Sequence, residues 1–116
     1  MEQLRENKYA TYIKESYNRE YFETENGFAT FSFPETMPDV CVIHNMWVDS
    51  SNRKHGDASR MADKVEEIAR ECNVKYLLCE IDSRSQTYSQ ALIAITNYGF
   101  KITDTSGYYV VLQKEI

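Results

Sequence analysis

Three basic residues and a glycine stand together at one point of the chain, in the order Arg53, Lys54, His55, Gly56. They follow an apolar run and come directly before an amphipathic one. The first turn of a helix has backbone N–H groups without an intrahelical partner and a partial positive charge, so a phosphate fits there. A glycine lets the backbone approach such an anion closely. The pattern indicates an anion site, and a plain helix start is the alternative.

Two further side chains are candidates for moving a proton. His44 interrupts an otherwise apolar strand, and the ordinary pKa of histidine, near neutrality, suits a general base. Glu80, in a second apolar run, is a second candidate base. The alternative for His44 is a core histidine that bonds to a backbone carbonyl, and the alternative for Glu80 is a carboxylate at the rim of a site.

The spacing of apolar residues shows which elements position these side chains. Residues 40–49 are apolar on both faces, as in a central strand that is covered on both sides. From residue 58 onward apolar residues recur at spacings of three and four, which predicts an amphipathic helix. Residues 74–82 form the second apolar run. A strand, a helix and a strand in this order imply a right-handed crossover, so we expect the two strands to be parallel neighbours.

The remaining segments complete an α/β (α+β) fold. We expect a helix over residues 2–17, and Asn26-Gly27 predicts a hairpin between strands at 21–25 and 28–33. A later helix, capped by Ser83 or Ser85, ends at Gly99 and leads into a closing hairpin. The sequence thus predicts a mixed central sheet with a parallel central strand pair and helices on both faces.

Composition narrows the class of protein. The 116 residues suit one domain spanning 1–116, and 18 acidic against 13 basic residues give a net charge of −5. Nucleic acid is therefore not expected as a partner, because binding to phosphate backbones needs a basic surface. No run approaches the length of a membrane span and no signal sequence is seen, so we expect no membrane partner and a cytoplasmic location. Three cysteines without CxxC spacing predict buried thiols.

A family resemblance adds to these interpretations. The stretch from Arg53 to Ala58 matches the Arg/Gln-x-x-Gly-x-Gly/Ala motif of GCN5-related N-acetyltransferases (GNAT). In that family the motif follows the central strand and opens the helix that holds the pyrophosphate of acetyl-coenzyme A. Residues 91–100, which end in Gly99-Phe100, resemble the family's late helix. The compact layout is similar to small members encoded by bacteriophages, one of which modifies a host protein.

The resemblance implies roles for individual residues. Backbone groups of Trp47 and Val48 would pair with the pantetheine arm of the coenzyme. The position of His44 matches the catalytic histidine of arylalkylamine acetyltransferases in the family. The pyrophosphate loop would consist of Arg53, Lys54, His55, Gly56, Asp57, Ala58 and Ser59.

Two positions depart from the family's pattern. Asp57 puts a carboxylate in the loop, where it would either repel phosphate or turn outward as a favourable acid in the first helical turn. Ile95 stands where many members have a tyrosine that protonates the leaving thiolate, and neither Tyr98 nor Tyr88 stands at that position.

The sequence therefore implies an N-acetyltransferase that moves an acetyl group from acetyl-coenzyme A to an amine by direct attack. The acceptor would be a protein lysine, a protein N-terminus or a small polyamine. The alternative is a degenerate, non-catalytic member of the same fold that serves as an interaction or structural protein, of a phage for example. The departures at Asp57 and Ile95 favour this alternative.

Overall fold

The computed structural model describes residues 7–53 and 56–116. Within them the chain forms three α-helices, one 3-10 turn and six strands. In chain order these elements are α1 (Lys8–Tyr17), β1 (Glu20–Thr24), β2 (Gly27–Ser32), β3 (Val40–Val48), η1 (Ser50–Asn52), α2 (Asp57–Glu71), β4 (Tyr76–Asp82), α3 (Tyr88–Tyr98), β5 (Lys101–Ser106) and β6 (Tyr109–Glu115).

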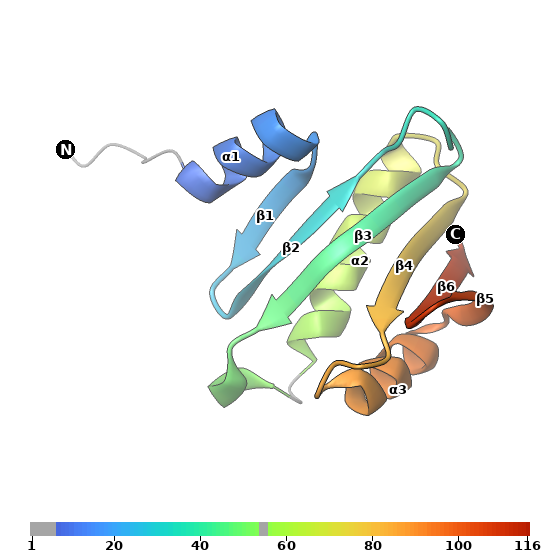
Figure 1. Cartoon of the computed structure of the whole chain (residues 1–116). Helices are drawn as coiled ribbons and strands as arrows, with labels where there is room; N and C mark the ends of the chain where they lie inside the picture. Colours follow the sequence, from blue (N-terminus) through green and yellow to red (C-terminus); the bar gives the residue numbers. More distant parts are fainter. Residues whose placement is uncertain (1–6, 54–55) are drawn as a thin grey trace.

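The six strands form one mixed sheet in the order β1-β2-β3-β4-β6-β5. Only β3 and β4 are parallel, and they are joined through α2 (Figure 1). The other neighbours pair antiparallel. The predicted parallel pair is thus confirmed, as is the mixed sheet around it, because a strand–helix–strand unit closes in this way.

Helices cover both faces of the sheet, as predicted. Behind the sheet in Figure 1, α2 packs on β2 and β3, and α3 packs on β4. On the opposite face α1 lies along β1, where the ring of Tyr9 stands 6.0 Å from that of Phe28. The core lies between the sheet and α2, and its most buried members include Met61, Val65 and Leu77.

Two side chains, one in α2 and one at its C-terminal cap, differ from the sequence prediction. An amphipathic helix places its charged residues in solvent, and the cysteine thiols were predicted to be buried. Glu66 is only 8% exposed, because Lys114 from β6 and Arg70 one helical turn later both pair with its carboxylate. Cys72 is exposed rather than buried, because it is the residue that caps the helix after its last turn. Cys41 and Cys79 are buried as expected.

Local turn chemistry also shifts two element ends. The first hairpin turns at residues 25–26, one residue before the predicted Asn26-Gly27. Gly27 is instead the first residue of β2. A Cβ at this position would stand 2.0 Å from the Trp47 carbonyl oxygen, so the close approach to β3 requires a glycine. The N-cap of α3 is Thr87, not Ser83 or Ser85. Among the described residues, no helix has the length and apolar character of a membrane span.

Candidate active site

The central feature of the site is a gap between the two parallel strands. The strands β3 and β4 pair only from Val40 opposite Tyr76 to Ile43 opposite Cys79. Beyond this last pair β3 remains hydrogen-bonded to β2, and β4 remains hydrogen-bonded to β6, but β3 and β4 no longer pair with each other. Among the described residues, no strand pairs with residues 44–48 of β3 along this edge. Their backbone groups there are positioned to bind an extended ligand.

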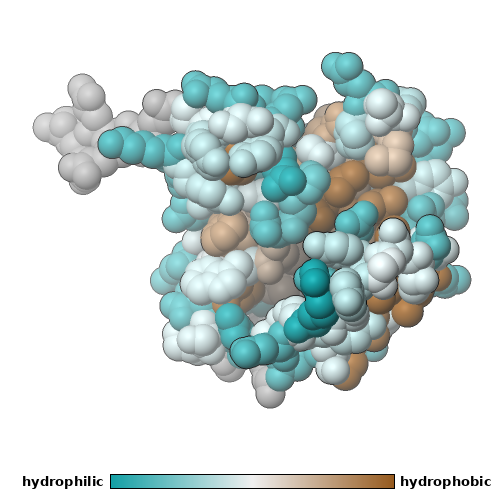
Figure 2. Space-filling view, viewed as in Figure 1, coloured by the Kyte–Doolittle hydropathy of each residue, from teal (hydrophilic) through white to brown (hydrophobic). Residues whose placement is uncertain are grey.

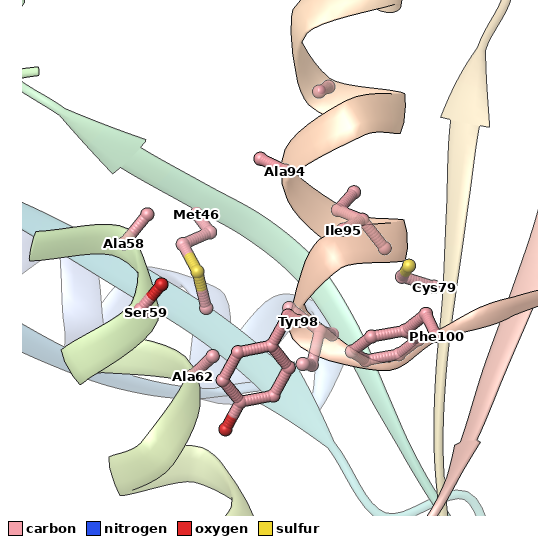
Figure 3. Close-up of a pocket in the computed structure, with 11 residues that line it drawn as sticks. Met46, Ala58, Ser59, Ala62, Cys79, Ala94, Ile95, Tyr98 and Phe100 are labelled. Carbon is pink, nitrogen blue, oxygen red and sulfur yellow. The ribbon is translucent and has the colours of Figure 1, made fainter. Parts of the chain in front are cut away.

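A cavity of about 200 Å³ lies behind this gap, between α2 and α3 (Figure 3). Small side chains of both helices leave this space open, and the gap between the strands forms its floor. Apolar walls of this kind suit an alkyl or amide chain rather than a charged group. The lining residues are Ile43, Met46, Ala58, Ser59, Ala62, Cys79, Ala91, Ala94, Ile95, Tyr98 and Phe100.

The open edge of β3 presents the backbone of Met46 and Val48. The carbonyl of Trp47 faces β2, where it approaches Gly27 closely. Successive carbonyls of an extended strand point to opposite edges, so those of Met46 and Val48 face the gap. In this structure the Val48 oxygen accepts a hydrogen bond of 3.0 Å from Arg53 Nε. Val48 thus lies where the sequence placed it, Trp47 is turned away, and Met46 is a residue that sequence reasoning missed.

The N-terminus of α2 opens onto the same cavity through Ala58 and Ser59. Gly56 is the N-cap residue, with φ +84° and no side-chain hydrogen bond to the first turn. Its conformation favours glycine, and the N–H groups of the first helical turn behind it are suited to an anion. Lys54 and His55, which the sequence assigned to this loop, lie outside the described residues.

Asp57 pairs with two neighbouring side chains. Its carboxylate accepts a hydrogen bond of 3.3 Å from Asn26 Nδ2 and forms an ion pair with Arg60. The guanidinium of Arg60 in turn lies beside Gly56, with Nη1 3.1 Å from where a Cβ of that residue would stand. The acid thus positions a cation near the helix start, a contact that the sequence analysis did not include.

His44 occupies an irregularity of β3. Thr30 pairs with Asn45 and Phe31 pairs with Ile43, so His44 is an extra residue in the ladder. Such bulges redirect side chains, and here the ring lies 2.7 Å from Ser32 Oγ, measured from Nε2. Burial, and secondarily the charge of Arg19, lower the pKa of His44 to about 4. The ring is therefore neutral at physiological pH.

Glu80 lies on the other side of the gap. It follows Cys79, just as His44 follows Ile43, at the last pair of the two strands. Side chains alternate along a strand, so Glu80 lies on the face opposite the cavity that Cys79 lines. His44 reaches that same face, because its partner Ser32 stands opposite Val42 there. The structure thus brings both predicted bases to one mouth of the gap.

Comparison with known proteins identifies the family. A profile of the Acetyltransferase (GNAT) family matches residues 6–100. The chain belongs to the GNAT acetyltransferase family. A search of curated proteins gave no match.

Solved structures share the GNAT fold with this chain at low sequence identity. An acetyltransferase from Elizabethkingia anophelis with acetyl-CoA bound is 17% identical, with 91% of this chain and 82% of that chain covered and a TM-score of 0.71. An acetyltransferase from Thermus thermophilus is 9% identical, with 91% and 70% covered and a TM-score of 0.78. The PaiA N-acetyltransferase of Thermoplasma acidophilum, in complex with coenzyme A, is 13% identical, with 78% and 54% covered and a TM-score of 0.70.

The leaving-group side of this GNAT site is apolar. Ile95 lines the cavity at the position where the family often has a tyrosine. The ring of Tyr98 also lines it, but its hydroxyl donates a hydrogen bond of 2.7 Å to Asp63 on α2. Burial, together with that bond, raises the pKa of Tyr98. Tyr98 is thus held in place as a structural link between α2 and α3, and its proton is engaged.

The half-buried His44 of this GNAT domain makes stability depend on pH. Because the folded protein lowers its pKa from 6.5 to about 4, the unfolded chain binds the proton more readily between these values. Stability is full above pH 6.5 and should fall as the pH drops towards 4. Urea unfolding at several pH values should show this loss in the wild type and a smaller loss in His44→Gln. Parallel pH profiles for the two proteins would contradict the assignment.

Proposed function

We propose that this protein transfers an acetyl group from acetyl-CoA to an amine by direct attack, without a covalent enzyme intermediate. One observation carries the proposal: the apolar cavity, the N-terminus of α2 and the open edge of β3 all meet at the gap between β3 and β4. A pyrophosphate, a pantetheine chain and a thioester together need an anion site, an open strand edge and an apolar space.

The residues present fit the coenzyme. The N–H groups at Gly56 and the following first turn would bind the pyrophosphate, and Arg53 and Arg60 would add positive charge. The backbone of Met46 and Val48 would pair with the amides of the pantetheine arm. Val48 would then exchange its bond from Arg53 for one to the ligand. When bound, acetyl-CoA supplies a thioester whose carbonyl an amine can attack.

His44 and Glu80 would act on the acceptor at the other face of the gap. The exposed carboxylate of Glu80 attracts the cationic amine. His44 is neutral and can therefore accept a proton at a ring nitrogen, directly or through one water. Its low pKa makes it a weaker base than one tuned to neutral pH, which points to modest turnover.

The protonation of the leaving thiolate falls to water in this proposal, because Ile95 has no proton to give and that of Tyr98 is engaged with Asp63. A positioned acid is typically worth about a hundredfold or more. The absence of a positioned acid at Ile95 and Tyr98 also favours the second candidate, a non-catalytic GNAT-fold interaction protein. The likeness to small phage-encoded members belongs to either candidate and rests on the compact layout alone.

Binding of the coenzyme provides the experiment. Acetyl-CoA at about a hundred times its dissociation constant should stabilise the fold by roughly 2.7 kcal/mol, seen as a raised melting temperature. S-acetylpantetheine, which lacks the nucleotide and the pyrophosphate, should give a much smaller shift at the same concentration. No shift with millimolar acetyl-CoA would exclude the enzyme and leave the interaction protein.

A further inference from the structure

One face of the sheet is left open over β3, β4 and β6. In Figure 1, α1 lies along β1, and no described helix stands in front of β3, β4 or β6. Val42 stands directly opposite Leu78, and Leu78 opposite Gln113, so these side chains share a row on this face. It is the face that His44 and Glu80 reach, opposite the cavity.

The middle of this open face is apolar. Val42 and Leu78 are half-buried, as is Val111, which stands opposite Glu80 on β6. Figure 2 shows apolar side chains exposed on this face in the region of β3 and β4. An apolar area beside a reaction site gains free energy when a ligand covers it.

Carboxylates surround this apolar centre. Glu80, Asp104 and Glu115 are exposed, and the strand register places each of them on the same face. Asp82, also on this face, is paired with Arg84. Lys101 is a cation beside them, and the charge of Arg19 acts on His44. The carboxylates still outnumber the cations, in a chain of net charge −5. The face is therefore suited to a ligand that combines apolar groups with positive charge.

An aromatic row borders the gap on its other side. The rings of Tyr9, Phe28 and Trp47 follow one another at 6.0 and 5.9 Å. Trp47 ends the row and is 47% exposed. Exposed aromatic rings bind both apolar side chains and cations, so the contact area extends from β6 across the gap to α1.

We propose that the acceptor is a polypeptide whose lysine side chain enters the gap at His44 and Glu80, while apolar residues on either side of that lysine cover Val42, Leu78 and Trp47. The inference rests on the proposed acetyl transfer. A small polyamine needs a concave site that encloses it, and it has no side chains for an open apolar face. A polypeptide covers such a face and brings its amine with it.

The single tryptophan of the chain, Trp47, reports on this contact directly. Two decapeptides with blocked ends and one central lysine are compared, one with leucine on both sides of the lysine and one with serine. We expect the leucine peptide to change the Trp47 fluorescence at about tenfold lower concentration than the serine peptide or spermidine, and to be acetylated fastest. Equal binding of the two peptides, no binding of either, or a preference for spermidine would overturn the proposal.

Variants separate this inference from the proposed function. Leu78→Ser should weaken binding of the leucine peptide about tenfold and leave the melting shift by acetyl-CoA unchanged. Val111→Ser is the second variant, in case Leu78→Ser folds poorly. The matched control is Ile93→Ser, at an exposed residue of α3. It should change neither the binding of the leucine peptide nor the melting shift by acetyl-CoA. If both face variants still bind acetyl-CoA and bind the leucine peptide as the wild type does, only the polypeptide acceptor is overturned. If the wild type does not bind acetyl-CoA, both proposals are overturned.

Discussion

Replacing Gly56 with glutamate is expected to weaken acetyl-CoA binding at least about a hundredfold. The new side chain would stand beside the Arg60 guanidinium, at the position where the pyrophosphate approaches the helix. Its carboxylate would repel the phosphates and compete for the same N–H groups. Losing one or two charge-assisted hydrogen bonds costs about 1.5–3 kcal/mol each, which corresponds to a hundredfold or more in affinity. Isothermal titration calorimetry measures this change.

Gly107 offers a matched control. It also has a positive φ, +60°, and a Cβ there meets nothing within 4 Å. Gly107→Glu therefore introduces a comparable backbone strain and the same charge at the turn between β5 and β6, far along the chain from α2. We expect it to bind acetyl-CoA like the wild type. Equal affinity in both variants would show that the loop before α2 is only a helix start.

His44→Ala is expected to lower turnover by about a hundredfold with little change in coenzyme affinity, once an acceptor is in hand. Coenzyme affinity should change little because the coenzyme would occupy the cavity between α2 and α3, whereas the His44 side chain lies on the opposite face of the sheet. Ile93→Ser, at an exposed residue of α3 away from that face, is the control and should keep the wild-type rate. A variant that loses stability but keeps its rate per folded molecule would make His44 a core histidine and leave Glu80 or water as the base.

The pH profile gives this prediction a second readout. A base with a pKa of about 4 is already neutral at pH 6, so its titration should appear as a loss of rate below about pH 5. The alanine variant should lack that acidic limb. A further rise of rate above neutrality should persist in both proteins, since it follows deprotonation of the acceptor amine. The sequence alone predicted a titration near neutrality, because it could not show that the ring is half-buried.

The fold was predictable wherever one pattern repeats along a segment. Apolar residues at spacings of three and four identified α2, and continuous apolar runs identified β3 and β4 and hence their parallel pairing. Gly56 was singled out because a glycine follows basic residues directly before such a helix. His44 was singled out because a titratable ring interrupts an apolar strand.

Most features that the sequence did not predict depend on contacts between distant segments. The separation of β3 from β4 after Ile43 follows from strand register, which no local pattern encodes. The hydrogen bond from Asn26 to Asp57 required the position of the first hairpin beside α2. The ion pair of Asp57 with Arg60, by contrast, lies within one turn of α2, at a spacing that the sequence could have indicated. Glu66 looked like a solvated acid because its partner Lys114 lies 48 residues further along the chain.

The most direct test of the central claim is a nitrogen-15 NMR titration with coenzyme A. The account predicts that the largest shifts of backbone amides occur at Met46, Val48 and the first turn of α2 from Gly56 to Arg60, with Gly107 and Tyr108 unchanged. Shifts confined to the open face of the sheet, or no shifts at millimolar coenzyme A, would contradict a coenzyme site at the gap between β3 and β4.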